Sequence, residues 1–370
     1  MNFNHSEDRQ MLTDTLGRYL QQRYPIEERH KISGSEDGWS STHWEALAEL
    51  GIVGALFDEG AGGFGGTGFD IAAIFEPNGR ALVVEPFLGT LMAGRALAQA
   101  GGQEALLEKM ILGTTLVAFA HEEPDSRYDL AGITTSAARA DDGWTLTGAK
   151  AVVAQIEPAD HVLVSARVTG SPGDETGIGL FLVERTADRL NVRGYPLIDG
   201  GRGGEIGLQE TPAQLITADA YSLVEEAIAA GIVALSWEAV GIMDVLKAAT
   251  LEYLRTRKQF GVPIGKFQAL QHRMATIALE IEQARSAAIN AADALDGDRQ
   301  KRERAVSAAK YTIGRVGTLV AEEAIQMHGG IGMTWELPLA HYAKRLTMIG
   351  HQLGDEDHHL DRFVMLGQAA

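Results

Sequence analysis

Two segments in the C-terminal part of the chain carry residue types that suit a phosphate-bearing or nucleotide ligand. In residues 255–275, Arg257 stands where a helix is about to end, before a turn at Gly261-Val262-Pro263. An arginine there can complement the C-terminal end of the helix dipole, or its planar guanidinium can pair with two phosphate oxygens. The dipole alone does not explain the spacing of Phe260, Phe267 and Gln268.

The second segment, residues 324–345, has a helix that runs into a glycine pair, Gly329-Gly330, after Gln326-Met327-His328. Glycine in the left-handed conformation commonly ends a helix. Two residues without Cβ also let the backbone approach a cofactor closely. Both interpretations can hold together.

Other candidate chemistry is weaker. Five acidic and histidine side chains near the C-terminus do not form a clean set of three at helical spacing, so we favour a solvated face and predict no metal site; they are Asp355, Asp357, His358, His359 and Asp361. Residues 60–68 are glycine-rich but lack the Gly-Lys-Ser/Thr ending and preceding strand of a phosphate loop. No GxSxG or HExxH motif occurs.

Helices come first along the chain. Ser6 is a plausible N-cap before Glu7 and Asp8, and helical spacing continues to about residue 120. Helices are predicted around Trp44 and over 71–80, 87–100 and 103–110, with 60–68 as a loop.

From about residue 115 the pattern becomes short apolar runs with alternation, and turn signals such as Asp142-Gly143. We expect a β domain here, with residues 200–204 (GGRGG) as a loop. Helical periodicity then returns over 223–257, 268–294 and 302–328, with 296–304 as a charged connector. The order is therefore α–β–α, with domains at 1–115, 116–215 and 220–370.

Composition limits the function. The chain has 370 residues, a net charge of −18 and no cysteine. An acidic chain argues against a nucleic-acid partner, and the lack of cysteine excludes disulfides, thiolate metal sites and a cysteine nucleophile. We see no signal peptide and no apolar stretch long enough to span a bilayer, so we expect a cytoplasmic protein with no membrane partner.

The two segments of the C-terminal part, together with the opening GWSSTHWEALAELGIVGALFDEGAGGFGG, resemble the acyl-CoA dehydrogenase family over nearly the whole chain. Residues 341–363, HYAKRLTMIGHQLGDEDHHLDRF, most resemble the small subunit of heteromeric members such as pimeloyl-CoA dehydrogenase. The resemblance implies an α+β fold with an N-terminal all-α domain, a middle β-barrel or sandwich, and a C-terminal four-helix bundle.

The resemblance also implies FAD as cofactor and an acyl-CoA as substrate. Arg257 would reach a pyrophosphate held mainly by a neighbouring subunit, and Gln268 would bind the adenosine half. The full set of implied FAD contacts is Arg257, Phe260, Gln268, Gln326, Gly329 and Gly330. Electron-transfer flavoprotein is the implied electron acceptor, and the assembly is a homotetramer or an α2β2 heterotetramer with a homologous large subunit.

Three departures stand out. The family's Thr-Glu-Pro-Gly-x-Gly-Ser-Asp segment becomes AHEEPDSRYDL, in which only Glu123-Pro124 matches. The Trp-Ile-Thr segment beside the flavin ring falls on Val152, Val153 and Ala154. The usual base position falls on Leu353 or Gln352, and the alternative one near Gly231 and Ile232.

These departures leave the catalytic base unassigned. Glu238 and Asp355 are weak candidates, because Glu238 lies about two helical turns from the alternative position and Asp355 is shifted from the usual one. Two hypotheses therefore remain open. The chain oxidises an acyl-CoA to the 2,3-enoyl-CoA, alone or in a heteromer, or it is a non-catalytic partner that completes the FAD site of a large subunit. A flavin oxidase or hydroxylase has no specific support.

Overall fold

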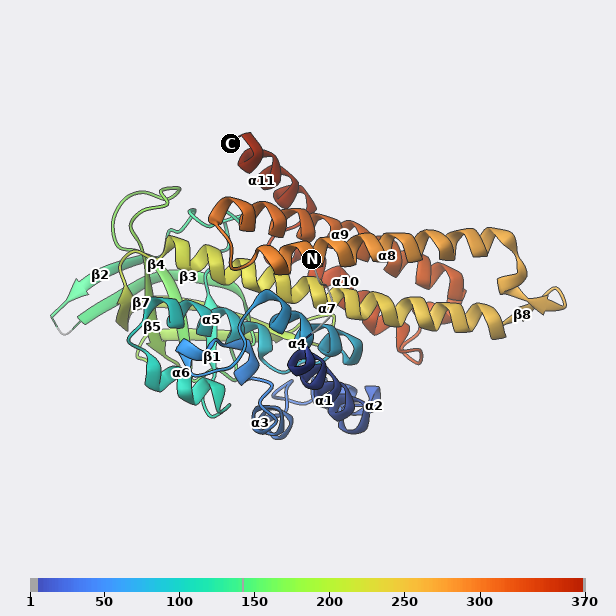
Figure 1. The fold of residues 1–370 in the computed structure, drawn as a ribbon. Coiled ribbons are helices and arrows are strands. Elements are labelled where there is room, and N and C mark those ends of the chain that lie inside the picture. The colour runs from blue at the N-terminus through green and yellow to red at the C-terminus, as the bar shows by residue number, and fades with distance from the viewer. Residues whose placement is uncertain (1–5, 142, 369–370) are drawn as a thin grey trace. The chain divides into compact units, whose positions relative to one another are not determined.

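The computed structural model describes residues 6–141 and 143–368. It has the predicted α+β fold, with an N-terminal helical domain, a middle β-barrel and a C-terminal helical bundle (Figure 1). Contacts divide the chain into a bundle unit, Met1–His30, Thr67–Val83 and Ile232–Ala370, and a barrel unit, Lys31–Gly66 and Val84–Gly231. N-terminal helices therefore belong to both units, and the predicted domain boundaries stay predictions.

The bundle unit is built from long helices around a buried interior. Ser6 caps the first of them as predicted, because its Oγ accepts from the Arg9 amide at 3.3 Å. The helices are α1 (Glu7–Arg23), α4 (Gly68–Ala81), α7 (Tyr221–Thr256), α8 (Gln268–Ala294), α9 (Arg299–His328), α10 (Leu339–His351) and α11 (Glu356–Gln368), with α7 beginning in the barrel unit and α2 (Ile26–Ser33) divided between the units.

Two glycines let α4 and α7 cross at backbone contact. A Cβ added at Gly79 would lie 2.1 Å from the carbonyl oxygen of Glu238, and one at Gly241 would lie 2.2 Å from that of Glu76. No side chain fits between the helices there, so this crossing fixes where Glu238 stands in the bundle.

The barrel unit joins short helices to a closed sheet. Five strands pair in a ring, β4–β2–β3–β7–β5 and back to β4, while β1 pairs with β4 and β6 with β7. The elements are α3 (Ser41–Glu49), η1 (Gly54–Leu56), η2 (Glu59–Ala61), α5 (Phe87–Ala100), α6 (Glu104–Ile111), β1 (Val117–Ala120), β2 (Ser136–Ala140), β3 (Gly143–Ala154), β4 (His161–Arg167), β5 (Ile178–Glu184), β6 (Leu190–Pro196) and β7 (Arg202–Thr217).

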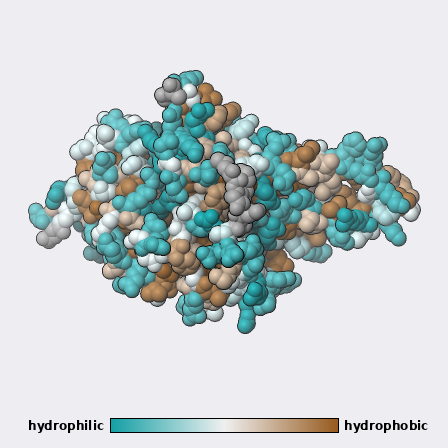
Figure 2. Space-filling view, in the orientation of Figure 1, coloured by the Kyte–Doolittle hydropathy of each residue, from teal (hydrophilic) through white to brown (hydrophobic). Residues whose placement is uncertain are grey.

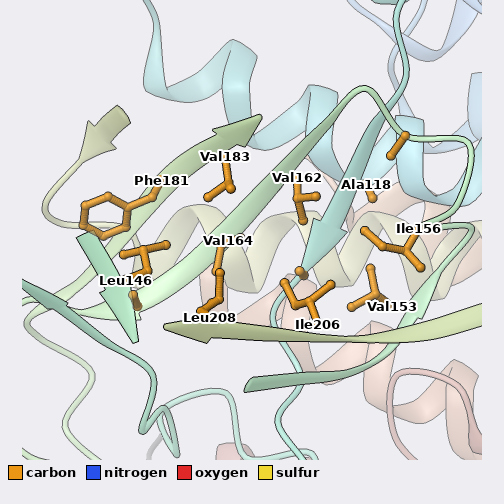
Figure 3. Packing of buried hydrophobic residues seen from close by; sticks show 13 residues of the cluster. Ala118, Leu146, Val153, Ile156, Val162, Val164, Phe181, Val183, Ile206 and Leu208 are labelled. Atoms are coloured by element: carbon orange, nitrogen blue, oxygen red, sulfur yellow. The ribbon is translucent and has the colours of Figure 1, made fainter. Parts of the chain in front are cut away.

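Apolar side chains from the strands meet inside this ring. Leu146, Val164 and Phe181 come from different strands and are fully buried, as Figure 3 shows. Their burial is the main favourable contribution to the folding of the barrel.

Three predicted boundaries were wrong. Arg202–Gly204 belongs to β7 rather than to a loop, because missing side chains let the strands approach; a Cβ at Gly204 would lie 2.9 Å from the carbonyl oxygen of Arg193 in β6. Helix α9 starts at Arg299, inside the predicted connector, because Asp298 caps it. Helix α4 starts at Gly68, since Thr67 and Asp70 form a capping box. Asp142, predicted in a turn, lies outside the described residues.

The expectation that no stretch could span a bilayer was also wrong by length and composition. Among the described residues, α7 is long and apolar enough, with a mean hydropathy of 1.6 over its best window. However, 89% of that window is buried in the fold, and a core helix passes the same test.

The helix crossing makes a direct prediction. Gly79→Ala should lower the free energy of unfolding by about 1–3 kcal/mol, because its Cβ must push two backbones apart. Gly17→Ala in α1 is the matched control, since nothing lies within 4 Å of its added Cβ, and it should raise stability by about 0.5–1 kcal/mol. Urea unfolding of both variants measures the difference; equal effects would contradict the close crossing.

Candidate functional site

The predicted pyrophosphate segment forms a hairpin at the far end of the α7–α8 pair (Figure 1). Strands β8 (Lys258–Gln259) and β9 (Val262–Pro263) are joined by Phe260 and Gly261, whose φ angles are +53° and +79°. Two positive φ angles are typical of a type I′ turn, in which asparagine or glycine is usual. Phe260 pays a conformational cost there, of about 1–2 kcal/mol, and is 91% exposed.

Arg257 stands at the base of this hairpin. Its amide donates to the Tyr253 carbonyl at 2.8 Å, and its own carbonyl accepts from Ile264 at 2.8 Å. Its side chain is exposed and makes no ion pair within the described part of the chain. The backbone is therefore fixed while the guanidinium remains open to an external anion.

The glycine pair ends α9 as predicted. The Gly329 amide donates to the carbonyls of Ile325 and Gln326, and its φ is +68°. A Cβ added at Gly329 or Gly330 would meet nothing within 4 Å, so this backbone borders open space. Gln326 is exposed beside it.

An aromatic contact brings the two segments together. The ring of Tyr253 stacks on that of His328 with centroids 4.4 Å apart, and Arg273 forms a two-bond ion pair with Glu323. Tyr253 lies one helical turn before Arg257, and His328 immediately precedes Gly329. All six predicted FAD contacts therefore lie at one end of the bundle unit, on exposed residues.

Glu238 does not have the environment of a free base. It is 6% exposed, and its two carboxylate oxygens accept from Arg345 at 2.5 and 2.8 Å. Arg345 also donates to Gln352 Oε1 at 2.9 Å. This bidentate pair favours a structural role, joining α7 to α10.

Asp355 is engaged as a helix cap. Its Oδ1 accepts from the amide of His358 at 2.9 Å, directly before α11 begins at Glu356. A capping carboxylate satisfies an otherwise unpaired helix amide. Both base candidates thus have structural partners.

The turn at Leu353-Gly354, where the family's base is expected, is stabilised by hydrogen bonds from buried side chains to its backbone carbonyls. Lys310 donates to the carbonyls of Gly350 and Gly354 at 3.0 and 2.5 Å. Burial lowers the pKa of His359 to about 3, so its neutral ring donates through Nε2 to the Leu353 carbonyl at 2.8 Å. Within the described residues, no group of three or more acidic or histidine side chains is arranged to hold a metal.

The barrel unit contains a buried ion pair, between Lys150 and Glu123, that the sequence analysis did not predict. Lys150 is fully buried, and its Nζ donates to Glu123 Oε1 at 2.8 Å, to the His121 carbonyl and to Ser165 Oγ. Burial alone would raise the pKa of Glu123, but Lys150 and hydrogen bonds from Thr134 and Thr135 lower it to about 2. Desolvation lowers the pKa of Lys150 to about 8. A lysine inside the apolar run GAKAVV was the available signal.

Positive φ angles mark both family segments that are altered in the barrel unit. Val152 has a φ of +52° at a break in the β3–β7 register and is 50% exposed. Arg127 and Tyr128 have φ angles of +46° and +69°. Counted from Pro124, Arg127 stands at the second glycine of the family's segment, and Asp129 matches its aspartate, so more of the segment survives than the sequence prediction held.

Comparison with known proteins agrees with this geometry. Three family models cover the chain: acyl-CoA dehydrogenase N-terminal domain (6–114), middle domain (118–207) and C-terminal domain (221–362). Acyl-CoA dehydrogenase IpdE2 of Mycolicibacterium smegmatis is 30% identical over 361 residues, covering 96% of this chain and 98% of the relative. The chain belongs to the acyl-CoA dehydrogenase family. This is a family of FAD-dependent oxidoreductases, so FAD is its cofactor.

Two solved structures are similar to this chain over almost its whole length. The Tcur3481–Tcur3483 steroid ACAD matches with a TM-score of 0.89 and 29% identity, over 98% of this chain and 99% of that one. The ChsE4–ChsE5 complex of Mycobacterium tuberculosis matches with a TM-score of 0.89 over the full length of both chains, and at 23% identity it supports the fold alone.

The bundle unit fits the dinucleotide end of FAD. An open guanidinium suits a pyrophosphate, and bare glycine backbone bordering open space lets a nucleotide approach.

The Glu123 carboxylate should give a pH-dependent contribution to stability. Its folded pKa is about 2, below its ordinary value of 4.5, so its contribution is present above pH 4.5 and is lost as pH falls towards 2. The stability gap between wild type and Glu123→Gln should therefore shrink by roughly 3 kcal/mol over that window in urea unfolding. Glu210→Gln, on an exposed ion pair, should show no such change. A gap independent of pH would contradict the assignment.

Glu238→Gln separates the structural from the catalytic role. Glutamine removes the carboxylate that pairs with the partly buried Arg345, so stability should fall by about 3 kcal/mol while turnover of the assembled enzyme stays at the wild-type rate. Glu282→Gln, at an exposed carboxylate, should change neither. Loss of kcat without loss of stability would instead identify Glu238 as the base.

Proposed function

We propose that this chain is the subunit of a heteromeric acyl-CoA dehydrogenase that completes the FAD site of a homologous large subunit, which supplies the base. The observation that carries the proposal is the Leu353-Gly354 turn. Its backbone is held in place by Lys310 and His359, yet it presents a leucine, while Glu238 is bound to Arg345 and Asp355 caps a helix.

The residues of this chain would act on the cofactor's phosphate and adenosine end. Arg257 would pair with two pyrophosphate oxygens, and the Gln268 side chain would hydrogen-bond the adenosine half. Gln326 and the amides of Gly329 and Gly330 would contact adenine and ribose. Bound FAD supplies the hydride acceptor for oxidation of an acyl-CoA to the 2,3-enoyl-CoA.

Several observations support a heteromer over a chain that acts alone. The ring-side positions carry Val152 and Ala154 in place of an indole and a hydroxyl. Residues 341–363 resemble the small subunit of pimeloyl-CoA dehydrogenase and related heteromers. One similar structure, a steroid ACAD, has the paired name Tcur3481–Tcur3483. We therefore favour an α2β2 assembly in the cytoplasm that passes electrons to electron-transfer flavoprotein.

The proposed substrate is a thioester with a bulky acyl group, of which a steroid side-chain acyl-CoA is the first choice, because one similar structure is a steroid ACAD. Flavin bleaching of the complex by CoA thioesters of different sizes tests this. Bleaching by short, straight acyl chains alone would contradict it.

Co-expression tests the subunit role. This chain, produced with a homologous acyl-CoA dehydrogenase subunit from the same organism, should purify as a yellow mixed tetramer that reduces ferrocenium with an acyl-CoA. If the chain purifies alone as a yellow homotetramer with full activity, the proposed role is wrong.

Arg257→Ala should raise the dissociation constant of FAD from that complex at least about tenfold, because a charge-assisted, two-bond contact is lost. Arg189→Ala, on the exposed surface of the barrel unit, is the matched control and should retain FAD. Flavin absorbance after dialysis measures both; full occupancy in the Arg257 variant would refute the pyrophosphate contact.

A further inference from the structure

We infer that His328 binds the adenosine half of FAD directly, with its Nε2 atom accepting a hydrogen bond from a donor group of the adenine or the ribose. His328 immediately precedes the glycine pair whose backbone borders open space. The inference rests on the proposed function and adds to it a direct contact from the ring that stacks on Tyr253.

The tautomer of the His328 ring is fixed by its own helix. The Nδ1 atom lies 2.8 Å from the carbonyl oxygen of Ala324. Because a carbonyl oxygen only accepts hydrogen bonds, Nδ1 must carry a hydrogen. Burial lowers the pKa of His328 from its ordinary value of 6.5, so the ring is neutral at pH 7 and has a single N–H group. The second nitrogen, Nε2, therefore presents a lone pair and acts as an acceptor.

This acceptor is accessible although the residue is largely buried. His328 is only 6% exposed. Within residues 6–141 and 143–368, Nε2 has no hydrogen-bond partner, and it is not among the side-chain atoms that are both buried and without a partner. The small exposed part of the side chain therefore includes its available acceptor. A fixed lone pair at the surface of an otherwise buried ring suits recognition of a ligand.

The surface around His328 carries the other groups that we assign to the cofactor. Tyr253 stacks on its ring and lies one helical turn before Arg257, while Gly329 follows it directly. A Cβ added at Gly329 or Gly330 would meet nothing within 4 Å, so a ligand can approach this backbone. At this end of the bundle, Figure 2 shows hydrophilic and apolar residues intermixed. Such a surface suits a nucleotide, which has a flat base and a polar sugar.

The chemistry of the acceptor selects the adenosine half of the cofactor. A pyrophosphate offers only acceptor oxygens near neutral pH, so it cannot pair with a second acceptor. Adenine has a 6-amino donor, and the ribose hydroxyls donate as well. An acceptor that a ligand covers without supplying a donor weakens binding, because its hydrogen bond to water is lost. Arg257 and His328 therefore divide the cofactor between them, the arginine taking the phosphates and the histidine the adenosine.

A variant that keeps an aromatic ring and removes the acceptor tests the contact. His328→Phe should raise the dissociation constant of FAD from the complex with the large subunit about three- to tenfold, because one hydrogen bond is lost while a ring still stacks on Tyr253. His351→Phe, the same change at an exposed histidine of α10, is the matched control and should leave the constant unchanged. Flavin fluorescence titration measures the constant, and circular dichroism with melting temperature confirms that each variant is folded.

Altered cofactors test the same contact without changing the protein. One of three FAD analogues, with hypoxanthine in place of adenine or with a 2′-deoxyribose or 3′-deoxyribose, lacks the donor that His328 binds. That analogue should bind the wild-type complex about three- to tenfold more weakly than FAD. It should bind the His328→Phe complex as tightly as FAD does, because the two changes remove the same hydrogen bond.

The outcomes separate this inference from the proposed function. Wild-type FAD affinity in His328→Phe, or losses in the variant and in every analogue that simply add, would overturn the adenosine contact; weakened binding in Arg257→Ala would then leave the heteromer standing. If all three analogues bind the wild-type complex as tightly as FAD, the contact is wrong even where His328→Phe does not fold. Failure of the wild-type chain to bind FAD together with the large subunit would overturn both proposals.

Discussion

The proposed site depends on the stacking of Tyr253 against His328. The two residues belong to helices α7 and α9, and their rings lie 4.4 Å apart with an interplanar angle of 26°. Burial lowers the pKa of His328, which keeps the ring neutral, and its Nδ1 is bound to the Ala324 carbonyl at 2.8 Å. Arg257 lies one helical turn after Tyr253, and Gly329 directly follows His328. The contact between the two rings therefore sets the position of the Arg257 guanidinium relative to the glycine backbone at residues 329 and 330.

The molecule keeps the framework of its family while changing the side chains that would react. Lys310 and His359 hydrogen-bond the carbonyls of the Leu353-Gly354 turn, yet the residue at the base position is a leucine. In the barrel unit the buried pair of Lys150 and Glu123 fixes the segment around Thr134, while the neighbouring positions lack an indole and a hydroxyl. A scaffold retained without its reactive groups agrees with a role in binding.

The sequence predicted best those features that are local. Helices α5 and α8 begin and end where periodicity and flanking residues placed them, and Ser6 caps α1. The glycine end of α9 was also read correctly, since its conformation depends on a few adjacent residues. Resemblance supplied a middle β-barrel or sandwich and the cofactor, which periodicity alone does not give.

Features that depend on residues distant in sequence were not predictable in this way. Nothing near Glu238 indicates that Arg345 will occupy both of its oxygens, and the burial of Lys150 follows from closure of the barrel. Glycine usually marks a loop, so the sequence predicts a loop at residues 200–204, whereas in the structure the missing side chains permit close packing of β7 against β6. Tertiary contacts decided each case.

The central claim is that this chain grips the phosphate and adenosine end of an FAD whose ring and base-bearing site lie in another subunit. The most direct measurement is the mass of the intact, co-expressed complex under native conditions, which counts the FAD molecules bound. The account predicts one FAD for each pair of this chain and its large subunit. One FAD for every copy of both subunits would contradict it.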